Sequence, residues 1–506
     1  METCTSKVCV SFVFYPCPQL PFSQLNAIMV HSEKVTKEKI MKLLYAIYDF
    51  LWGDLLTIPL PGGSTLGNSL LVLILIPVGT FYTVKTRFVL VRKFPEMLRI
   101  VTEKRGEDTK GISGLQALIV STATRVGMGN LVGVVAAISA GGAGAVFWMW
   151  LIALLGSSTA FAEATLAQLY KQKDPLYGGY RGGPAYYIHH FMTTRKGCKN
   201  PEKRYSLIAA LFAISGLICW GGISQVISNS VTASMENAFH IPPLYTTIAL
   251  VAVAAVIVLR KNATVKVLDV MVPIMAGGYF IITIFVIVKN FGALPGVLER
   301  IFAEAFGIRQ IAGGGIGAVI MNGAKRGLFS NEAGSGSAPC AAAAADVDHP
   351  AKAGLLQAFG VFIDTIVICS CTAFLLLLAP EAQMAGLEGM DLLQAALEFH
   401  LGQFGVVFIA ITLLLFSFST FIGVLFYARS NVAYLFGDNW ASQTIYKIIA
   451  LIMLFIGGLA TYTFVWDLGD VGIGLMTIFN MVALIPMSGK VMETLKDYEE
   501  KKKIKN

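Results

Sequence analysis

Charged residues and histidines are scarce in this sequence. Asp, Glu, Lys and Arg make up 14% of the 506 residues, against about 25% in soluble domains. The six histidines fall in expected loops or at the ends of apolar segments, and the sequence has neither an HExxH zinc pattern nor a GxxxxGK[ST] phosphate loop. These absences argue against a soluble protein, an ATP-driven pump and an intramembrane metal enzyme. No cofactor is expected.

Long apolar segments, by contrast, fill most of the chain. Hydrophobic residues make up 55% of it, and the mean hydropathy is +0.68. About eleven segments are long enough to cross a bilayer, which takes about 20 apolar residues. They lie at residues 66–90, 114–140, 144–170, 206–235, 243–260, 266–289, 309–340, 353–379, 403–428, 443–460 and 467–488. The sequence therefore predicts an all-α polytopic membrane protein with about 11 transmembrane helices.

The placement of the basic residues predicts the orientation. Lys and Arg concentrate in three regions, at residues 85–110, 171–204 and 490–505. The connections without any Lys or Arg are 237–243, 379–400 and 461–466. The positive-inside rule places the basic regions in the cytoplasm, and an odd number of spans then leaves the N-terminus outside. The net charge of +8 thus reflects topology in a plasma membrane rather than nucleic-acid binding.

The N-terminal segment, residues 1–65, differs in character from the rest. We expect residues 36–60 to form an amphipathic interfacial helix, followed by a turn in PLPGG at Pro59–Gly63. The residues before this helix resemble neither a span nor a cleaved signal peptide. Translation is therefore expected to begin at Met29 or Met41.

Two apolar segments are interrupted by polar residues and glycines. RVGMGN at Arg125–Asn130 interrupts the first, and KRGLFSNEAGSGSAPCAAAAA at Lys325–Ala345 interrupts the second. Hydrocarbon tolerates irregular backbone only where protein buries it or where it lines an aqueous cavity. Broken segments in corresponding positions of two halves are typical of transporters that bind substrate between the halves.

The interruptions divide most of the chain into two repeats, 114–289 and 309–488. Each repeat opens with a broken segment and contains five predicted helices. Because five is odd, the second repeat must enter the membrane from the opposite side, which gives a five-plus-five inverted repeat. A peripheral transmembrane helix at 66–92 precedes the repeats. A basic cytoplasmic tail at 489–506 follows them. It is most simply a solvated end, and the alternative is a role in contacting lipid headgroups.

Three blocks of sequence resemble the alanine or glycine:cation symporter family of bacteria and archaea, also called the sodium:alanine symporter family. They are VGMGNLVGV at Val126–Val134, GGAGAVFWMWLIALLG at Gly141–Gly156 and KRGLFSNEAGSGSAP at Lys325–Pro339. GGPAYYI at Gly182–Ile188 and YLFG at Tyr434–Gly437 add support. The resemblance implies a leucine-transporter-like fold with broken first and sixth core helices. It also implies transport of small neutral amino acids with Na⁺ or H⁺.

Two positions depart from the family pattern. The family commonly has Thr where this chain has Met128, and Trp where this chain has Val424. Both positions are similar to pocket-lining positions of the family. Loss of an indole at Val424 would enlarge the cavity, and Met128 replaces a hydroxyl with a longer apolar arm. The substrate is therefore alanine-like or glycine-like, or a larger neutral amino acid.

An amino-acid zwitterion needs an anion site and a cation site close together. We expect its carboxylate at the backbone N–H groups of Met128 and Gly129, because a restarting helix presents free N–H groups and the positive end of its dipole. The ammonium would face the carbonyls freed between Phe329 and Asn331. Gln225 matches a pocket glutamine of the family; its alternative role is a hydrogen bond between helices.

The resemblance also implies a sodium site. Sodium prefers oxygen ligands, and the matching positions are the carbonyls of Ala123 and Val126 with the hydroxyls of Ser419 and Thr420. The alternative is that the hydroxyls only bond to their own helix. Asn130 is a candidate ligand of a second cation site.

Charged side chains in mid-membrane are costly, at about 2.5–3.5 kcal/mol each. Asp364 is therefore a candidate cation ligand or proton site, and the alternative is a carboxyl group bonded to nearby backbone. Glu163 and Glu332 are expected to hold the unwound segments. Arg125 is expected to reach toward the membrane surface or to pair with a carboxylate.

Sodium-coupled symport is the leading prediction, and it has three alternatives. Protons could replace sodium, with Asp364 carrying the proton. A channel is a weaker alternative, because broken helices also build pores. An intramembrane enzyme is the weakest, because it needs a nucleophile with a base, or metal ligands, at membrane depth. The expected partners are a small neutral amino acid, Na⁺ or H⁺, and the lipid bilayer.

Overall fold

The fold is described from a computed structural model, which covers residues 39, 41–59, 65–103, 112–195, 205–260, 264–307, 316–384 and 386–505. The chain divides into two units, Met1–Ile47 and Tyr48–Asn506. The described part of the first unit is helical, and everything below concerns the second. Met29, most of the predicted turn at 59–63 and the first residues of the predicted span 309–340 lie outside the described residues.

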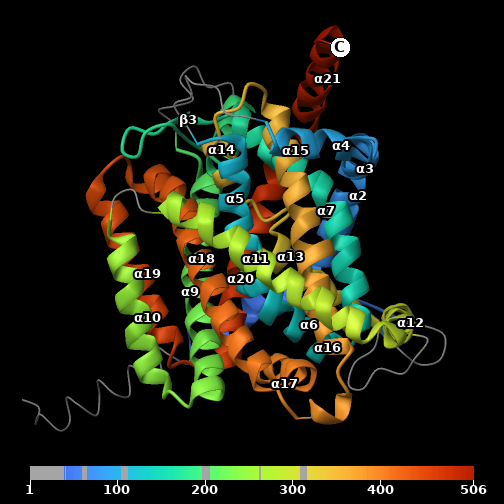
Figure 1. Cartoon of the computed structure of the whole chain (residues 1–506). Helices are drawn as coiled ribbons and strands as arrows, with labels where there is room; N and C mark the ends of the chain where they lie inside the picture. Colours follow the sequence, from blue (N-terminus) through green and yellow to red (C-terminus); the bar gives the residue numbers. More distant parts are fainter. Residues whose placement is uncertain are drawn as a thin grey trace, which may run out of the picture. The chain divides into compact units, whose positions relative to one another are not determined.

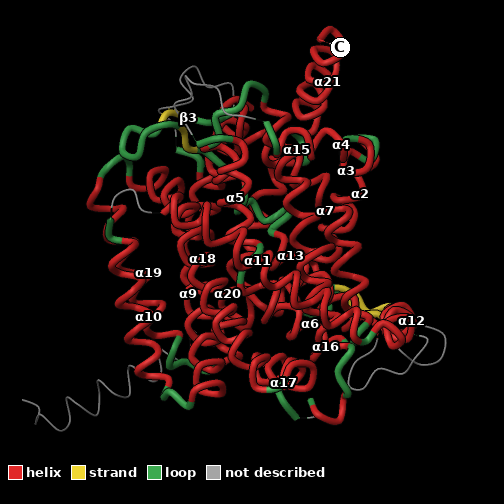
Figure 2. Tube along the Cα trace, viewed as in Figure 1, coloured by secondary structure: helices red, strands yellow, loops and turns green. Residues whose placement is uncertain are grey.

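Helices occupy all of the predicted apolar segments. The unbroken ones are α2 (Leu70–Lys85), α7 (Gly144–Leu169), α9 (Leu207–Phe239), α10 (Pro243–Val258), α11 (Thr264–Lys289), α18 (Gln403–Phe436), α19 (Trp440–Gly457) and α20 (Tyr462–Leu484). Among the described residues, seven helices are long and apolar enough to span a membrane, or eight if a bent pair counts as one span. Figure 2 shows how strongly helices dominate this part of the chain.

Two of the predicted spans are broken, as the glycine and asparagine patterns indicate. The first consists of α5 (Gly114–Arg125), a π-helical turn η1 (Gly129–Gly133) and α6 (Val134–Gly141), and its two parts are bent by 48°. The second consists of α13 (Ile316–Asn331) and the short α14 (Pro339–Ala344), separated by irregular backbone.

A third span is continuous but widened. It runs through α15 (Pro350–Val361), the π-helix η4 (Phe362–Cys369) and α16 (Ser370–Leu377). The wide turn of η4 contains Asp364, whose side chain is fully buried. A π-turn often marks a functional position in a helix. We therefore expect η4 to contribute to the site.

Close packing in the centre depends on small residues. α9 packs against α18, α19 and α20, and α9 and α18 run side by side in the centre of Figure 1. A Cβ atom on Gly472 of α20 would lie 2.4 Å from Cys219 Cα, and one on Gly457 of α19 would lie 2.3 Å from Gln225 Cα. These glycines therefore allow α9 to contact its neighbours through backbone, as small-residue packing in membranes does.

The N-terminal interfacial helix is shorter than predicted. The predicted helix 36–60 is wrong beyond Trp52, because Gly53 ends the helical turn and β1 (Leu56–Pro59) pairs with β2 (Thr65–Asn68) in an antiparallel hairpin. Sequence analysis also did not predict several short elements. They are β3 (Gln172–Lys173), β4 (Tyr180–Arg181), α8 (Pro184–Arg195), α12 (Leu294–Ala305) and α17 (Gly389–Leu401).

The basic tail is a docked helix rather than a solvated end. α21 (Ser488–Lys505) lies against α4 (Phe94–Val101), where the Tyr498 hydroxyl donates to Glu96 at 2.8 Å and Lys502 forms an ion pair with the same carboxylate. Burial alone would raise the pKa of Glu96, but the hydrogen bonds from Lys502 and Tyr498 outweigh it and lower that pKa. The carboxylate is therefore charged at neutral pH and helps to hold α21 in place.

Candidate functional site

The first break brings backbone and hydroxyl oxygens together. The Ser419 hydroxyl of α18 donates to the Ala123 carbonyl at 3.1 Å, and the Met128 N–H donates to the Thr420 hydroxyl at 3.4 Å. Both hydroxyls also donate to the Phe416 carbonyl of their own helix, at 2.8 Å. The predicted sodium ligands Ser419, Thr420 and Ala123 thus lie in one buried cluster. Val126, which ends α5, begins the break beside them.

Two glycines, which have no side chain, allow α18 to approach the break this closely. A Cβ atom on Gly127 would lie 1.9 Å from the Thr420 hydroxyl oxygen, and one on Gly423 would lie 2.2 Å from Thr124 Cγ2. Any larger residue at either position would push α5 and α18 apart. The glycines of VGMGN and FSFSTFIG therefore set the distance between the hydroxyls and the freed backbone.

Asn130 closes the break from the other side. Its Oδ1 accepts a hydrogen bond from the Gly127 N–H at 2.9 Å, and its Nδ2 donates to Asp364 Oδ1 at 2.6 Å. Asp364 Oδ2 accepts from Ser330 of α13 at 2.9 Å and from Thr365 at 2.6 Å. Asp364 therefore bonds mainly to side chains rather than to nearby backbone, and it links the first broken span to the second.

The second break is held by a buried carboxylate. Glu332, Gly334 and Gly336 have φ angles of 58°, 98° and 84°, a left-handed conformation that favours glycine. Glu163 of α7 accepts a hydrogen bond from the Gly334 N–H at 3.0 Å and another from Asn480 of α20 at 2.5 Å. Glu163 therefore contacts the backbone of the unwound segment directly.

Glu332 connects the second break to the first through a tyrosine. The Tyr427 hydroxyl of α18 donates to Glu332 Oε2 at 3.2 Å and lies 2.5 Å from the Thr124 hydroxyl of α5. Tyr427 lies seven residues after Thr420, so both fall on one face of α18. Sequence analysis missed Tyr427, although this spacing from the Ser–Thr pair would have been a signal.

Arg125 does not reach the membrane surface. Its side chain is 1% exposed, and its guanidinium donates to the Gln357 side chain at 3.0 Å and to the Gln357 carbonyl at 3.3 Å. The prediction of a surface position is therefore wrong. The helices are packed closely around Arg125, because a Cβ atom on Gly360 would lie 2.7 Å from its guanidinium.

The end of α13 lies beside the restart of the first broken span. A Cβ atom on Gly129 would lie 3.5 Å from the Phe329 ring, so the proposed carboxylate and ammonium sites are neighbours. The Phe329 ring contacts Trp466 of α20, with ring centres 4.9 Å apart. Asn331 Oδ1 accepts from the Ala333 N–H at 3.0 Å, whereas its buried Nδ2 has no hydrogen-bond partner among the described residues.

The remaining predicted pocket residues differ in position. Met128 and Val424 are both buried, the first in the break and the second one turn after Thr420 on α18. The Gln225 amide instead donates to the Met453 sulfur of α19 at 3.1 Å. This hydrogen bond is a contact between helices, the alternative role, while the buried Oε1 of Gln225 has no hydrogen-bond partner among the described residues.

A family comparison matches almost the whole of this architecture. Residues 61–506 match the model of the sodium:alanine symporter family. The chain belongs to this family. Its broken spans and buried hydroxyls are therefore those of a membrane symporter, and the alternatives of an enzyme and of a channel are not supported.

Several relatives of this symporter span nearly the same length. The amino-acid carrier protein AlsT of Bacillus subtilis is 41% identical over 433 residues, covering 85% of this chain and 89% of AlsT. The probable sodium/glutamine symporter GlnT of the same organism is 42% identical, with 87% and 89% covered. The sodium/alanine symporter AgcS of Methanococcus maripaludis is 32% identical, with 92% and 98% covered.

A solved structure shows the fold of the symporter. MhsT in complex with L-phenylalanine superposes with a TM-score of 0.53 at 13% identity, covering 74% of this chain and 89% of MhsT. At this identity the likeness concerns the fold alone. The symporter therefore has the leucine-transporter-like helical fold that its sequence resemblance implies.

Sequence analysis missed one further charged cluster of the symporter. Arg326 of α13 forms a bidentate ion pair with Asp470 of α20, with both hydrogen bonds at 3.0 Å. The Lys325 ammonium lies 3.3 Å from the same carboxylate. The Trp466 ring lies 4.2 Å from the Arg326 guanidinium. The signal was available, because three charges within two apolar segments must find partners.

Proposed function

We propose that this protein couples the entry of Na⁺ to the uptake of a neutral amino acid by alternating access. The observation that supports this proposal most is the meeting of Ser419 and Thr420 with the freed backbone of the first break. A hard cation in a membrane needs oxygen ligands that replace its hydration shell. The cluster offers two hydroxyls and the carbonyl ends of α5.

The sodium ligands would be the carbonyls of Ala123 and Val126 with the hydroxyls of Ser419 and Thr420. The Ser419 hydroxyl already lies 3.1 Å from the Ala123 carbonyl. With Na⁺ bound, the hydroxyl would turn its lone pair toward the ion, because a carbonyl that binds a cation no longer attracts a proton donor. Small rotations would therefore suffice to form the site.

Asn130 and Asp364 would form the second coupling position. Asp364 accepts hydrogen bonds from Asn130 of η1 and Ser330 of α13, so a cation bound at this carboxylate would stabilise both broken spans at once. The same contacts suit proton coupling. A protonated Asp364 would change these bonds without any metal ligand, and this is the one alternative that an observed contact favours.

The substrate would bind where the two breaks meet. Its carboxylate would accept from the N–H groups of Met128 and Gly129, and its ammonium would donate to carbonyls between Phe329 and Asn331. The unpaired Nδ2 of Asn331 is a further donor at this position. Val424 would line the side-chain pocket.

A neutral amino acid larger than alanine would fit this pocket. Val424 stands where the family commonly has Trp, so the pocket would be wider in this chain. The relatives named for alanine and for glutamine both align over most of the chain. We therefore propose that alanine, serine and glutamine are the first substrates to test.

The proposed organisation follows the sequence pattern. Residues 114–289 and 309–488 would form the two inverted repeats, with the helix at 66–92 outside them. The N-terminus would lie outside and α21 in the cytoplasm of a cell with this protein in its plasma membrane. In this arrangement Glu163 and Glu332 support the second break rather than contact the substrate.

The sodium gradient is sufficient for accumulation. Moving one charge through 100 mV yields about 2.3 kcal/mol, and a tenfold concentration gradient adds about 1.4 kcal/mol. Together they would sustain an amino-acid gradient of roughly several hundredfold. One sodium ion per substrate therefore accounts for uptake without ATP.

Uptake into proteoliposomes tests the proposal. Radiolabelled alanine, serine and glutamine are offered with an inward sodium gradient, with an inward proton gradient, and with neither. Accumulation with sodium alone supports the proposal. Accumulation with the proton gradient alone would transfer the coupling role to Asp364, and uptake that never exceeds the external concentration would contradict symport.

A further inference from the structure

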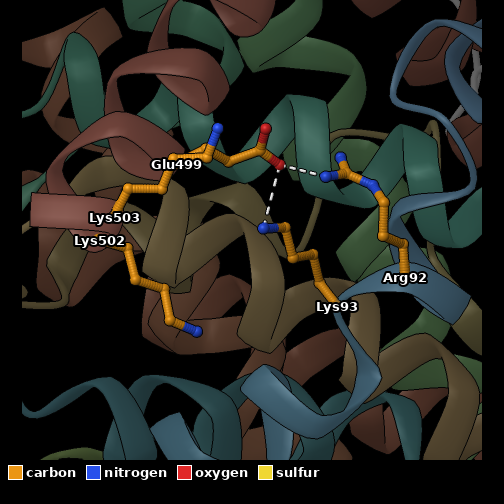
Figure 3. Close-up of a pocket in the computed structure, with 5 residues that line it drawn as sticks. All are labelled: Arg92, Lys93, Glu499, Lys502 and Lys503. Carbon is orange, nitrogen blue, oxygen red and sulfur yellow. Dashed lines mark hydrogen bonds and ion pairs between the residues drawn. The ribbon is translucent and has the colours of Figure 1, made fainter. Parts of the chain in front are cut away.

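A basic pocket lies between α21 and the start of α4. It has a volume of about 300 Å³ and is lined by Arg92, Lys93, Glu499, Lys502 and Lys503. Figure 3 shows these side chains around the opening, with Glu499 reaching both Arg92 and Lys93. Four cations and one carboxylate line the pocket, so it carries an excess of positive charge.

The negative charge of the neighbouring carboxylates is smaller than the positive charge of the pocket's four basic side chains. Glu499 pairs with Arg92 and, at 3.1 Å, with Lys93, while Lys502 pairs with Glu96 behind the pocket. Burial alone would raise the pKa of Glu499, but the hydrogen bonds from Arg92 and Lys93 outweigh it and lower that pKa. The four cations that line the pocket therefore share Glu499 and Glu96, and Glu96 also pairs with Arg99.

The pocket lies at the end of an apolar helix whose outer face is exposed. Lys85, the last residue of α2, donates to Ser488 at the start of α21 at 2.8 Å. Phe88 is 59% exposed and Val91, next to Arg92 in α3 (Val89–Arg92), is 73% exposed. In a membrane protein such apolar side chains beside a cationic cluster indicate the boundary between acyl chains and headgroups.

We propose that this pocket binds a phosphate group, and that anionic phospholipid supplies it. Arg92 offers a planar donor fork suited to phosphate oxygens, and the lysines add point charges. Phe88 and Val91 would contact the acyl chains of the same lipid. A lipid bound there would bridge α3 to α21 and so fix the C-terminal helix to the membrane.

Lipid binding to matched charge variants tests this site. The pocket variant is Lys93→Gln with Lys503→Gln. The control is Lys490→Gln with Lys496→Gln, which removes the same charge from exposed positions of α21 outside the pocket. Short-chain phosphatidylglycerol, phosphatidylcholine and inorganic phosphate are each added to the purified full-length protein. Bound molecules are counted by native mass spectrometry, and the thermal midpoint is measured in parallel.

The expected result is a selective loss in the pocket variant. Each basic residue near a membrane surface contributes about a fivefold change in affinity for anionic lipid, so the pocket variant should bind phosphatidylglycerol roughly 25-fold more weakly. The control should change less than about twofold, and Glu499→Gln should bind about fivefold more tightly.

Comparing phosphatidylglycerol with inorganic phosphate and phosphatidylcholine identifies the source of the bound phosphate group. Binding of phosphatidylglycerol without inorganic phosphate at millimolar concentration supports a lipid headgroup. Binding of both, each lost in the pocket variant, supports the phosphate site with solution phosphate as a second source. Equal losses in the pocket variant and the control, or equal binding of phosphatidylcholine, would overturn the proposal.

Discussion

The backbone N–H groups of the short break after α5 donate to neutral oxygens, whereas a carboxylate accepts directly from the backbone of the longer break after α13. Hydroxyls of Ser419 and Thr420 approach the first break, with hydrogen-bond distances of 3.1 and 3.4 Å. Glu163 accepts directly from the backbone of Gly334 in the second, at 3.0 Å. The two broken spans therefore differ in how firmly their backbone is held.

This difference suggests a division of roles. Neutral hydroxyls can turn toward a cation and then back, at the cost of about one ordinary hydrogen bond. A buried carboxylate that accepts hydrogen bonds from backbone N–H groups can break these bonds only at a much larger cost in free energy, because the buried groups would then be unpaired. In the proposed function, the first break would bind the ion reversibly and the second would provide support. Asp364, which contacts residues of both broken spans, would transmit ion binding between them.

The largest effect is expected at the second break. Glu163→Gln would replace one of the two carboxyl oxygens, which accept from the Gly334 N–H and from Asn480, with an NH₂ donor. A buried polar group left without its partner costs about 1–3 kcal/mol, so the variant should lose about 3 kcal/mol of folding free energy and almost all transport. The measurement is the thermal midpoint in detergent with lipid.

The exposed carboxylate Glu236 of α9 provides the control for this variant. Glu236→Gln should leave the midpoint within about 1 °C, since surface substitutions change stability by less than about 0.5 kcal/mol. An unchanged midpoint in Glu163→Gln would mean that the second break does not depend on its carboxylate.

The next effect is expected at Asp364. Asp364→Asn keeps the size of the side chain but removes the charge that Asn130 and Ser330 contact. If Asp364 helps to bind Na⁺, the sodium concentration for half-maximal uptake should rise about tenfold, which corresponds to about 1.4 kcal/mol. Sodium dependence is measured at two pH values. Loss of pH dependence with an unchanged sodium requirement would instead identify a proton site.

A smaller effect is expected in the side-chain pocket. Val424→Trp should fill space beside the first break and favour small substrates over large ones. Pocket changes of this size alter specificity by about 1–3 kcal/mol, so the ratio of alanine to glutamine uptake should rise at least about tenfold. Competition between the two labelled amino acids gives this ratio, and an unchanged ratio would mean that Val424 does not line the pocket.

The sequence predicts the helices and the breaks because both depend on local pattern. Apolar segments of about 20 residues have few alternatives to a membrane helix. Glycines beside Asn130 and Asn331 mark backbone that must leave the helix. The structure brings Ser419 into contact with the Ala123 carbonyl, two residues that the family resemblance implies as sodium ligands, and their role stays a prediction.

Other features depend on the direction of a side chain within a packed bundle, which the pattern does not determine. α9 is apolar around most of its circumference, so its sequence does not show that Gln225 faces Met453 of α19. The hairpin after Trp52 and the docking of α21 depend on partners far away in the chain. Arg125 is buried and donates to Gln357, which lies 232 residues later in the chain, and no local signal indicates that pairing.

The central claim, that the first break and α18 form the sodium site, is tested most directly by equilibrium binding of radioactive sodium to the purified protein. Ser419→Ala with Thr420→Ala should weaken sodium binding at least about tenfold, because two oxygen ligands are lost. Ser417→Ala is the matched control, since this buried hydroxyl of the same helix has no hydrogen-bond partner among the described residues. Normal sodium binding in the control and weak binding in the double variant is the predicted result. Normal sodium binding in the double variant would contradict the claim.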